Sequence, residues 1–250
     1  MPSVLEDSLI VNASEKHISQ SQAVPEESVK EAARRLLAKL GANGLSIVAV
    51  AEELDVAPDR ITFAHPHDLL TALIIDAYDA SGTAMEEADR DAHERQAGPG
   101  GRLLAAARGL RQWSITNPAE FALIYGSPVP GYDAPPETVP PAARTPAVLA
   151  GIVRAALEEG ALEPPRRPIP GPPLIRQEAI EVFGGLPPEP YSDLLERGIV
   201  LWSNLIGLLV FEVFSRTHDS VRDQGAFFDY AIAVTAEHIG LSVPAGDRID

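Results

Sequence analysis

Apolar residues recur along most of the chain at intervals of three and four, which places them on one face of an α-helix. The clearest run spans 26–40 and ends at Gly41, a residue suited to a helix C-terminus. Glu26 and Glu27 occupy the first turn, where the helix dipole favours negative charge. Its apolar positions are Val29, Ala32, Ala33, Leu36, Leu37 and Leu40. The pattern therefore predicts a helix over 26–40.

The next stretch, 45–70, predicts two short helices joined by a tight turn. Ser46 precedes an apolar run at helical spacing, and its hydroxyl is suited to cap the first-turn N–H groups. Pro58 is placed to open the second helix, at about 58–63, where its missing N–H is harmless. Two helices joined in this way form a helix-turn-helix, whose second helix can enter the DNA major groove.

The remaining apolar runs also have helical spacing, and no convincing alternating strand pattern accompanies them. Prolines predict extended loops over 127–146 and 164–173. The other expected helices cover 68–96, 102–116, 118–126, 146–159, 174–183, 190–216 and 225–240. The sequence therefore predicts an all-α protein.

Composition narrows the class of protein. A chain of 250 residues that is 45% apolar can bury a substantial core. It contains no cysteine, which excludes disulfides and thiolate sites and favours a cytoplasmic location. The longest apolar stretch, 198–214, is interrupted by Ser203, Asn204 and Glu212, so we expect a buried helix and no membrane span. No basic segment followed by an apolar run suggests a signal peptide.

The net charge of −16 argues against extensive wrapping of nucleic acid, which depends on lysine and arginine near phosphates. A local basic face remains compatible with this total, because screening acts over about 10 Å. The 26–40 helix carries four basic residues away from its apolar face, either as a solvated surface or as phosphate contacts. They are Lys30, Arg34, Arg35 and Lys39. Over 26–70 as a whole, five basic residues stand against eight acidic ones.

The sequence predicts no catalytic site and no cofactor. It lacks a glycine-rich phosphate loop, a hydrolase-type serine motif and a paired-carboxylate site with supporting context. His65 and His67 could suggest a metal, but zinc needs three or four donors and no second cluster stands out. We therefore expect no metal, and interpret 65–68 as the start of a helix, with Asp68 favouring its dipole. An enzyme is not expected.

Several short motifs occur in a specific order: AA at 32–33, LL at 36–37, GLSI at 44–47 and VAEEL at 50–54. With Val56 and Pro58 in the turn and Leu69-Leu70 beyond it, this order resembles the N-terminal domain of the TetR family of transcriptional regulators. That resemblance implies an all-helical homodimer. Its N-terminal three-helix domain would bind double-stranded operator DNA, and its larger C-terminal domain would bind a small-molecule effector and dimerise.

The C-terminal part is similar to one branch of that family, named for a Trp-His-Gly signature. FALIYGSPVPGY at 121–132 and LWSNLIG at 201–207 carry this similarity. The implied domains are a flexible arm (1–25), a helix-turn-helix DNA-binding domain (26–70) and a helical ligand-binding and dimerisation domain (71–243).

The chain departs from the family pattern at three places in the N-terminal part and at one in the C-terminal part. The segment between Val56 and Leu69 is about two residues short; Thr62 or Phe63 lies where a phosphate-contacting tyrosine is usual; and His67 replaces a common lysine. These departures weaken the implied DNA affinity. In the C-terminal part, Ile206 stands in place of the signature histidine.

Two sets of site residues are expected. Arg60 is the one long basic side chain of the second short helix, and arginine suits a bidentate guanine contact. The DNA-binding set is Ser46, Arg60, Thr62, Phe63, His65 and His67. The ligand-binding set, each member of which is also compatible with an ordinary core position, is Trp113, Phe121, Tyr125, Trp202, Ile206 and Phe211. Arg111 and Gln112 are further possible polar contacts. Asn204 and Glu212 could bind ligand, satisfy neighbouring groups or lie at a dimer seam.

The segments 190–216 and 225–240 are too hydrophobic to stay exposed in a monomer, so we expect them to form a two-fold, four-helix dimer interface. The leading hypothesis is a repressor that a small molecule releases from a palindromic operator. The alternative is a degenerate relative that binds a small molecule or protein partner and has lost specific DNA binding.

Overall fold

The computed structural model describes residues 23–165, 169, 174–217 and 220–244. Regular structure in these ranges is helical, apart from one isolated antiparallel bridge between Leu162 and Leu241. The all-α prediction is therefore confirmed. The arm expected over 1–25 lies almost entirely outside the described residues.

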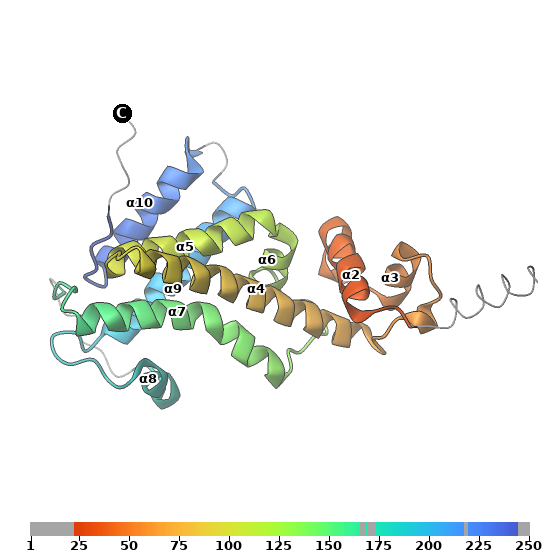
Figure 1. The fold of residues 1–250 in the computed structure, drawn as a ribbon, viewed down its shortest axis with the longest axis horizontal. Coiled ribbons are helices and arrows are strands. Elements are labelled where there is room, and N and C mark those ends of the chain that lie inside the picture. Colours follow the sequence, from red (N-terminus) through yellow and green to blue (C-terminus); the bar gives the residue numbers. More distant parts are fainter. Residues whose placement is uncertain (1–22, 166–168, 170–173, 218–219, 245–250) are drawn as a thin grey trace, which may run out of the picture. The chain divides into compact units, whose positions relative to one another are not determined.

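Contacts divide the chain into two compact units. Unit 1 runs to Leu73 and also takes in Val129–Tyr132, whereas unit 2 covers Ile74–Pro128 and continues from Asp133. Helix α4 (Pro66–Glu94) contributes residues to both units. The elements of each unit are labelled in Figure 1.

Unit 1 is built on α2 (Glu26–Leu40), whose bounds agree with the predicted 26–40 helix. Its apolar face is buried, as the three-and-four spacing requires. A short 3-10 turn, η1 (Ala42–Gly44), leads to α3 (Ile47–Glu53). The Ser46 hydroxyl oxygen caps α3 by accepting the Ala49 N–H at 3.1 Å.

The second short helix, expected at about 58–63, is a wrong prediction. Only one 3-10 turn, η2 (Pro58–Arg60), forms before the chain becomes extended at Ile61. The Arg60 carbonyl accepts a hydrogen bond from the Val24 N–H at 2.9 Å, and the Ile61 side chain is only 8% exposed. An outside backbone donor and a buried isoleucine therefore favour an extended chain where a second helical turn would begin.

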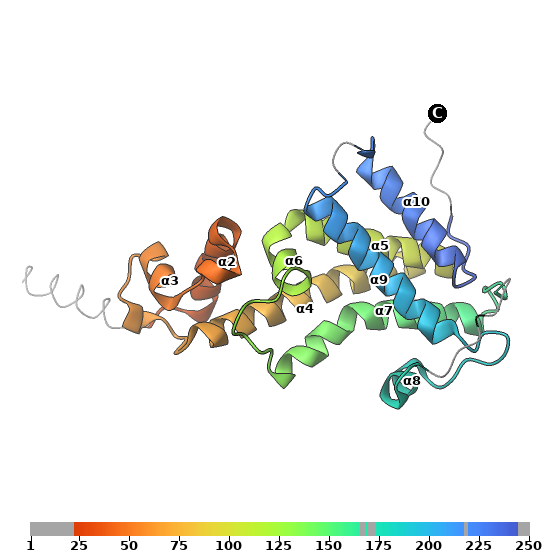
Figure 2. The same cartoon turned by 180° about the vertical axis from the view of Figure 1, so that it is seen from behind.

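Unit 2 is a bundle of helices around one core. Within it, α5 packs against α7, α9 and α10, and α9 also packs against α7 and α10. Figure 2 shows α9 from the side on which it crosses the bundle. Besides the rest of α4, the helices are α5 (Pro99–Thr116), α6 (Pro118–Tyr125), η3 (Pro136–Thr138), α7 (Val139–Glu158), α8 (Gln177–Phe183), α9 (Leu194–Val213) and α10 (Gln224–Glu237).

Helix α7 begins at Val139, so the extended loop expected over 127–146 is wrong in its second half. Prolines in the first turn lack an N–H that would have no helical partner in any case, and Pro146 is accommodated inside the helix. Arg144 fixes this part of α7 to α4 through Asp79 at 2.7 Å and Glu86 at 2.6 Å. These tertiary contacts favour the helix despite its prolines.

Helix α9 is long and apolar enough, by length and composition, to cross a membrane, and it is the one such helix among the described residues. Core helices of globular bundles meet the same criteria. Four of its leucines lie in the core of unit 2: Leu194, Leu201, Leu205 and Leu209. Near its C-terminal end, Glu212 pairs with Arg111 of α5. One side of α9 therefore lies in the core of unit 2. The expectation of a buried helix is wrong for its other side, because only 22% of the apolar window is buried and Val200 and Phe211 are 50% and 51% exposed.

Candidate functional site

The four cations of the basic face of α2 are paired with two glutamates within unit 1, so its positive charge is partly neutralised. Hydrogen bonds from Arg34 and Lys30 hold the pKa of Glu27 below its usual range, and those from Arg35 and Lys39 do the same for Glu53. The pairs are Lys30–Glu27 at 3.0 Å, Arg34–Glu27 at 2.9 Å, Arg35–Glu53 at 2.9 Å and Lys39–Glu53 at 3.1 Å. A DNA phosphate at this face would compete with carboxylates that are already in place.

The residues expected to contact DNA lie in unit 1, and most follow α3 in one short stretch. Arg60 is half-buried at the end of η2, Thr62 and His65 are exposed, and Phe63 is half-buried. Ser46 lies at the other end of α3, where its oxygen caps the helix. The stretch thus presents one arginine and polar side chains from an extended segment.

A contact that sequence reasoning missed joins the start of α4 to the segment after α6. The Tyr132 hydroxyl lies 2.9 Å from Thr71 Oγ1, and its ring meets the His67 ring edge-on with centroids 5.8 Å apart. The GSPVPGY motif was singled out by resemblance, but no local pattern indicated its partner. The contact joins residues 61 positions apart, a separation that periodicity does not report.

In unit 2, Tyr125 is the centre of a packed aromatic cluster. Its ring centroid lies 5.3 Å from that of Phe121 and 6.1 Å from those of Tyr78 and Trp202. Burial raises the pKa of Tyr125 to about 12, although a hydrogen bond with Thr145, at 3.2 Å, acts in the opposite direction. Three of the six expected ligand residues therefore pack directly together.

The structure does not gather all six of those residues around one cavity. Trp113 and Ile206 are half-buried against the core, and Phe211 is 51% exposed on α9. Trp202 lines one cavity and Phe211 another.

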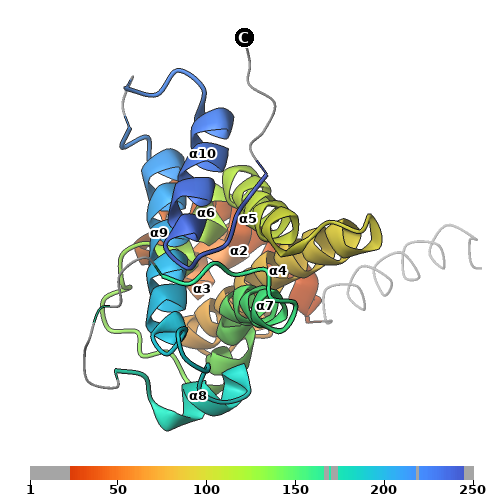
Figure 3. The ribbon, with the colours of Figure 1, turned by 90° about the vertical axis from the view of Figure 1, so that its left-hand side faces the viewer.

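The first cavity, here called the α8 cavity, has a volume of about 420 Å³ and lies between α7, α8 and α9. Figure 3 shows α8 near these two helices. The lining of the α8 cavity is overwhelmingly apolar, and Glu178 is the one charged residue in it. The sequence pattern did not indicate this cavity, because its walls combine three helices that are separated along the chain.

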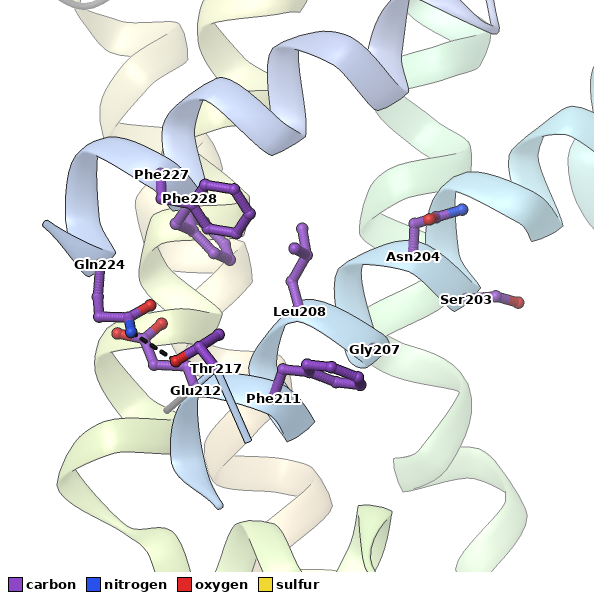
Figure 4. Close-up of a pocket in the computed structure, with 10 residues that line it drawn as sticks. All are labelled: Ser203, Asn204, Gly207, Leu208, Phe211, Glu212, Thr217, Gln224, Phe227 and Phe228. Carbon is purple, nitrogen blue, oxygen red and sulfur yellow. Dashed lines mark hydrogen bonds between the residues drawn. The ribbon is translucent and has the colours of Figure 1, made fainter. Parts of the chain in front are cut away.

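The second cavity, here called the α9/α10 groove, measures about 440 Å³. Figure 4 shows Phe211 on α9 together with Phe227 and Phe228 on α10, and the Gln224 amide donating to Thr217 Oγ1 at 2.7 Å. The groove continues an exposed apolar face of α9 and α10. The exposed members of that face include Val200, Phe211, Phe214, Phe227, Tyr230 and Val234.

The polar insertions of α9 have different surroundings. The Arg111 guanidinium donates to both Glu212 carboxylate oxygens, at 2.8 and 2.5 Å, so Glu212 is satisfied from α5. This pairing raises the pKa of Arg111. The exposed Asn204 amide donates to the Val200 carbonyl of its own helix at 2.9 Å and lines the α9/α10 groove. Gln112 is exposed and bonds Thr116 at 3.1 Å.

Comparison with known proteins matches residues 103–235 to the family described as tetracyclin repressor-like, C-terminal domain. HTH-type transcriptional regulators of Mycobacterium tuberculosis and Mycobacterium bovis are 32% identical over 221 residues, which cover 85% of this chain and 93% of each relative. The chain belongs to the TetR family. Its relatives are transcriptional regulators, so the protein belongs to a family of regulators and not of enzymes.

Solved structures agree with this TetR fold. The candidate regulatory protein SCO4313 has a TM-score of 0.63 at 26% identity, over 85% of this chain and 95% of that one. A bacterial regulatory protein in the TetR family from Rhodococcus RHA1 has a TM-score of 0.59 at 14% identity, over 87% and 97% of the two chains, and shows the fold alone. The Trp-His-Gly branch stays a prediction.

Proposed function

We propose that this TetR-family protein is a repressor that a small molecule releases from a palindromic operator. The observation that carries the proposal is the α8 cavity in unit 2. Its volume of about 420 Å³ falls within the size range of small-molecule pockets, and its lining is mostly apolar. A cytoplasmic location is part of the same proposal.

DNA reading is assigned to the stretch after α3. Arg60 would contact a guanine edge, and Thr62 a phosphate or a thymine methyl group. The Ser46 hydroxyl retains its proton for a phosphate oxygen, because its oxygen is the acceptor in the α3 cap. The imidazole N–H groups of His65 and His67 would donate to further phosphate oxygens. Phe63 stands near the usual place of a phosphate-contacting tyrosine.

The exposed apolar face of α9 and α10 supports a homodimer. A two-fold axis beside this face would bring the same helices of two chains together and remove their apolar side chains from water. Such a dimer would set two reading segments about one DNA turn apart on a palindrome. A ligand that binds better to a state with different spacing would shift the population off DNA.

The alternative is a degenerate relative that binds a small molecule or a protein partner without reading DNA. Two observations favour it: the second short helix is only the η2 turn, and glutamates already hold the basic face of α2.

The discriminating experiment is a mobility shift at low salt. The probes are the DNA flanking the protein's own gene and a random pool taken through rounds of selection. We expect one enriched palindrome, and Arg60→Ala should weaken binding to it by roughly tenfold or more, since a bidentate base contact contributes about 1–3 kcal/mol. Arg154→Ala, on an exposed face of α7, is the matched control.

The outcomes separate the two functions. Loss of sequence preference in Arg60→Ala with retention in Arg154→Ala supports the repressor. Absence of any enriched sequence favours the degenerate relative. Unchanged preference in Arg60→Ala would refute the role given to that residue.

A further inference from the structure

The α8 cavity is lined by side chains from three helices, with a buried apolar floor and an exposed rim that includes Val182 and Ile199. Of the lining residues, five are at most 7% exposed: Leu149, Val153, Phe183, Leu194 and Leu201. The Trp202 ring also lines it. An aromatic ring in such a wall offers its face to an apolar or aromatic ligand.

The size of the space selects the kind of occupant. Small-molecule pockets occupy about 300–1,000 Å³, whereas a stable protein interface needs roughly 800 Å² from each partner. A cavity of about 420 Å³ with walls from α7, α8 and α9 fits the first class. The α9/α10 groove, by contrast, adjoins the face assigned to the second copy of the chain.

The charge of the lining selects the chemistry. Glu178 is the one ionisable residue among the lining residues, so no lysine, arginine or histidine in the described wall offers a counter-ion to an anion. An anion moved into this space would lose hydration and would be repelled by the Glu178 carboxylate, and both effects are unfavourable. A cationic group placed near Glu178 has the opposite, favourable interaction.

We propose that the α8 cavity binds a predominantly apolar small molecule that is uncharged, or that carries one positive group beside Glu178. The role of the α8 cavity as an effector site rests on the proposed function above. The binding of an apolar molecule in the cavity does not depend on that function. The occupant is thus a hydrophobic or lipophilic cationic compound, and the described lining disfavours an acidic one.

Binding is tested with two probes of similar aromatic body and different charge. They are uncharged N-phenyl-1-naphthylamine and the sulfonated 1-anilinonaphthalene-8-sulfonate. In Trp113→Phe, Trp202 is the one tryptophan left, so energy transfer to a bound probe reports on the cavity wall. We expect the uncharged probe to quench Trp202 and to bind about tenfold or more tightly than the sulfonate. Glu178→Gln should narrow that difference.

Two glycines provide a matched pair of substitutions. Gly198 lines the cavity, and a Cβ built on it meets no atom within 4 Å, so Gly198→Leu would fill the space without a clash at its Cβ. Gly151 on α7 has the same open surroundings but does not line the cavity. We expect Gly198→Leu to abolish quenching of Trp202 and Gly151→Leu to retain it. Circular dichroism would verify that both variants remain helical.

Quenching of Trp202 tests whether the α8 cavity binds the probe, and release of the selected DNA tests whether that binding has an effector role. Equal binding of the sulfonate, or unchanged quenching in Gly198→Leu, would overturn the site. If quenching is lost in Gly198→Leu and retained in Gly151→Leu, but the uncharged probe does not release the selected DNA, the binding site is supported and its effector role is overturned. Release of DNA by the uncharged probe in wild type and Gly151→Leu, but not in Gly198→Leu, supports both.

Discussion

Glu53 shows how single residues set the charge that unit 1 presents to DNA. Its carboxylate accepts from Arg35 at 2.9 Å and from Lys39 at 3.1 Å. Ion pairs that solvent screens are weak, so a phosphate can displace the carboxylate. The carboxylate therefore weakens the local positive field and does not abolish it.

We predict that Glu53→Gln tightens DNA binding by about twofold to fivefold, a small effect because solvent screens the pairs that the substitution removes. Arg35 and Lys39 would then meet phosphates without a competing carboxylate. The measurement is a titration of the selected DNA at several salt concentrations, in which the salt dependence should also steepen. Glu31→Gln, which removes one negative charge from α2, is the control for Glu53 of α3. An equal gain in both variants would contradict a specific role for Glu53.

Tyr125 provides a residue-scale prediction about pH. Its folded pKa of about 12 lies above its ordinary value of 10, because burial disfavours the phenolate. The neutral form therefore contributes stability that is fully present below pH 10 and is lost as the pH rises through about 12.

The measurement is a spectrophotometric tyrosine titration of the wild type and of Tyr125→Phe. Their difference should contain one phenol with a midpoint of about 12. Tyr230, which is 66% exposed, supplies the comparison through Tyr230→Phe. If the phenol that Tyr125→Phe lacks titrates near pH 10 in the wild type, the Tyr125 ring is not buried as described.

At the scale of elements, apolar spacing and capping residues predict those helix boundaries that depend on nearby residues alone. The bounds of α2 and the Ser46 cap follow from apolar spacing and one hydroxyl, because both depend on residues within a few positions. The η2 turn and the start of α7 depend on partners far away in sequence. The Val24 N–H binds the Arg60 carbonyl, and Arg144 binds α4, so periodicity and proline count alone gave the wrong boundaries.

The candidate sites follow the same division. Arg60 and the short stretch around it were accessible from sequence, because they are adjacent in the chain. The α8 cavity was not, because Gly198, Glu178 and Val153 meet only through the packing of three helices. The aromatic residues expected around one ligand proved to be distributed between the core cluster and two cavities.

The pair Arg111–Glu212 connects α5 to α9, and its side chains are only 21% and 13% exposed. We predict that Arg111→Leu or Glu212→Leu alone lowers the free energy of unfolding by about 2–4 kcal/mol, because each leaves a largely desolvated charge without its partner. The double substitution should recover part of that loss. Denaturant unfolding at one fixed protomer concentration is the measurement.

The pair Arg108–Asp229 joins α5 to α10 and is the natural control, since Arg108 is 51% exposed. Arg108→Leu should change the free energy of unfolding by no more than about 1 kcal/mol. Similar losses at both pairs would indicate that burial does not determine the difference.

At the scale of the whole molecule, charge and apolar surface have opposing effects on assembly. A net charge of −16 on each chain disfavours association, so a dimer requires a compensating apolar contact. The exposed apolar face of α9 and α10 is the surface that can supply it, at roughly 25 cal/mol for each Å² removed from water. Association should therefore strengthen as added salt screens the charge.

Phe211 is the residue on which this assembly is most directly tested, because it is 51% exposed on that face and lines the α9/α10 groove. Phe211→Asp would bury a carboxylate twice in a two-fold interface, so we predict a monomer in sedimentation velocity at concentrations where the wild type is dimeric. Val139→Asp, which adds the same charge at a 64% exposed position on α7, should remain dimeric. The monomer should also lose affinity for the palindrome far more than for a single half-site, because only a dimer engages both. A Phe211→Asp protein that stays dimeric would place the interface on another surface.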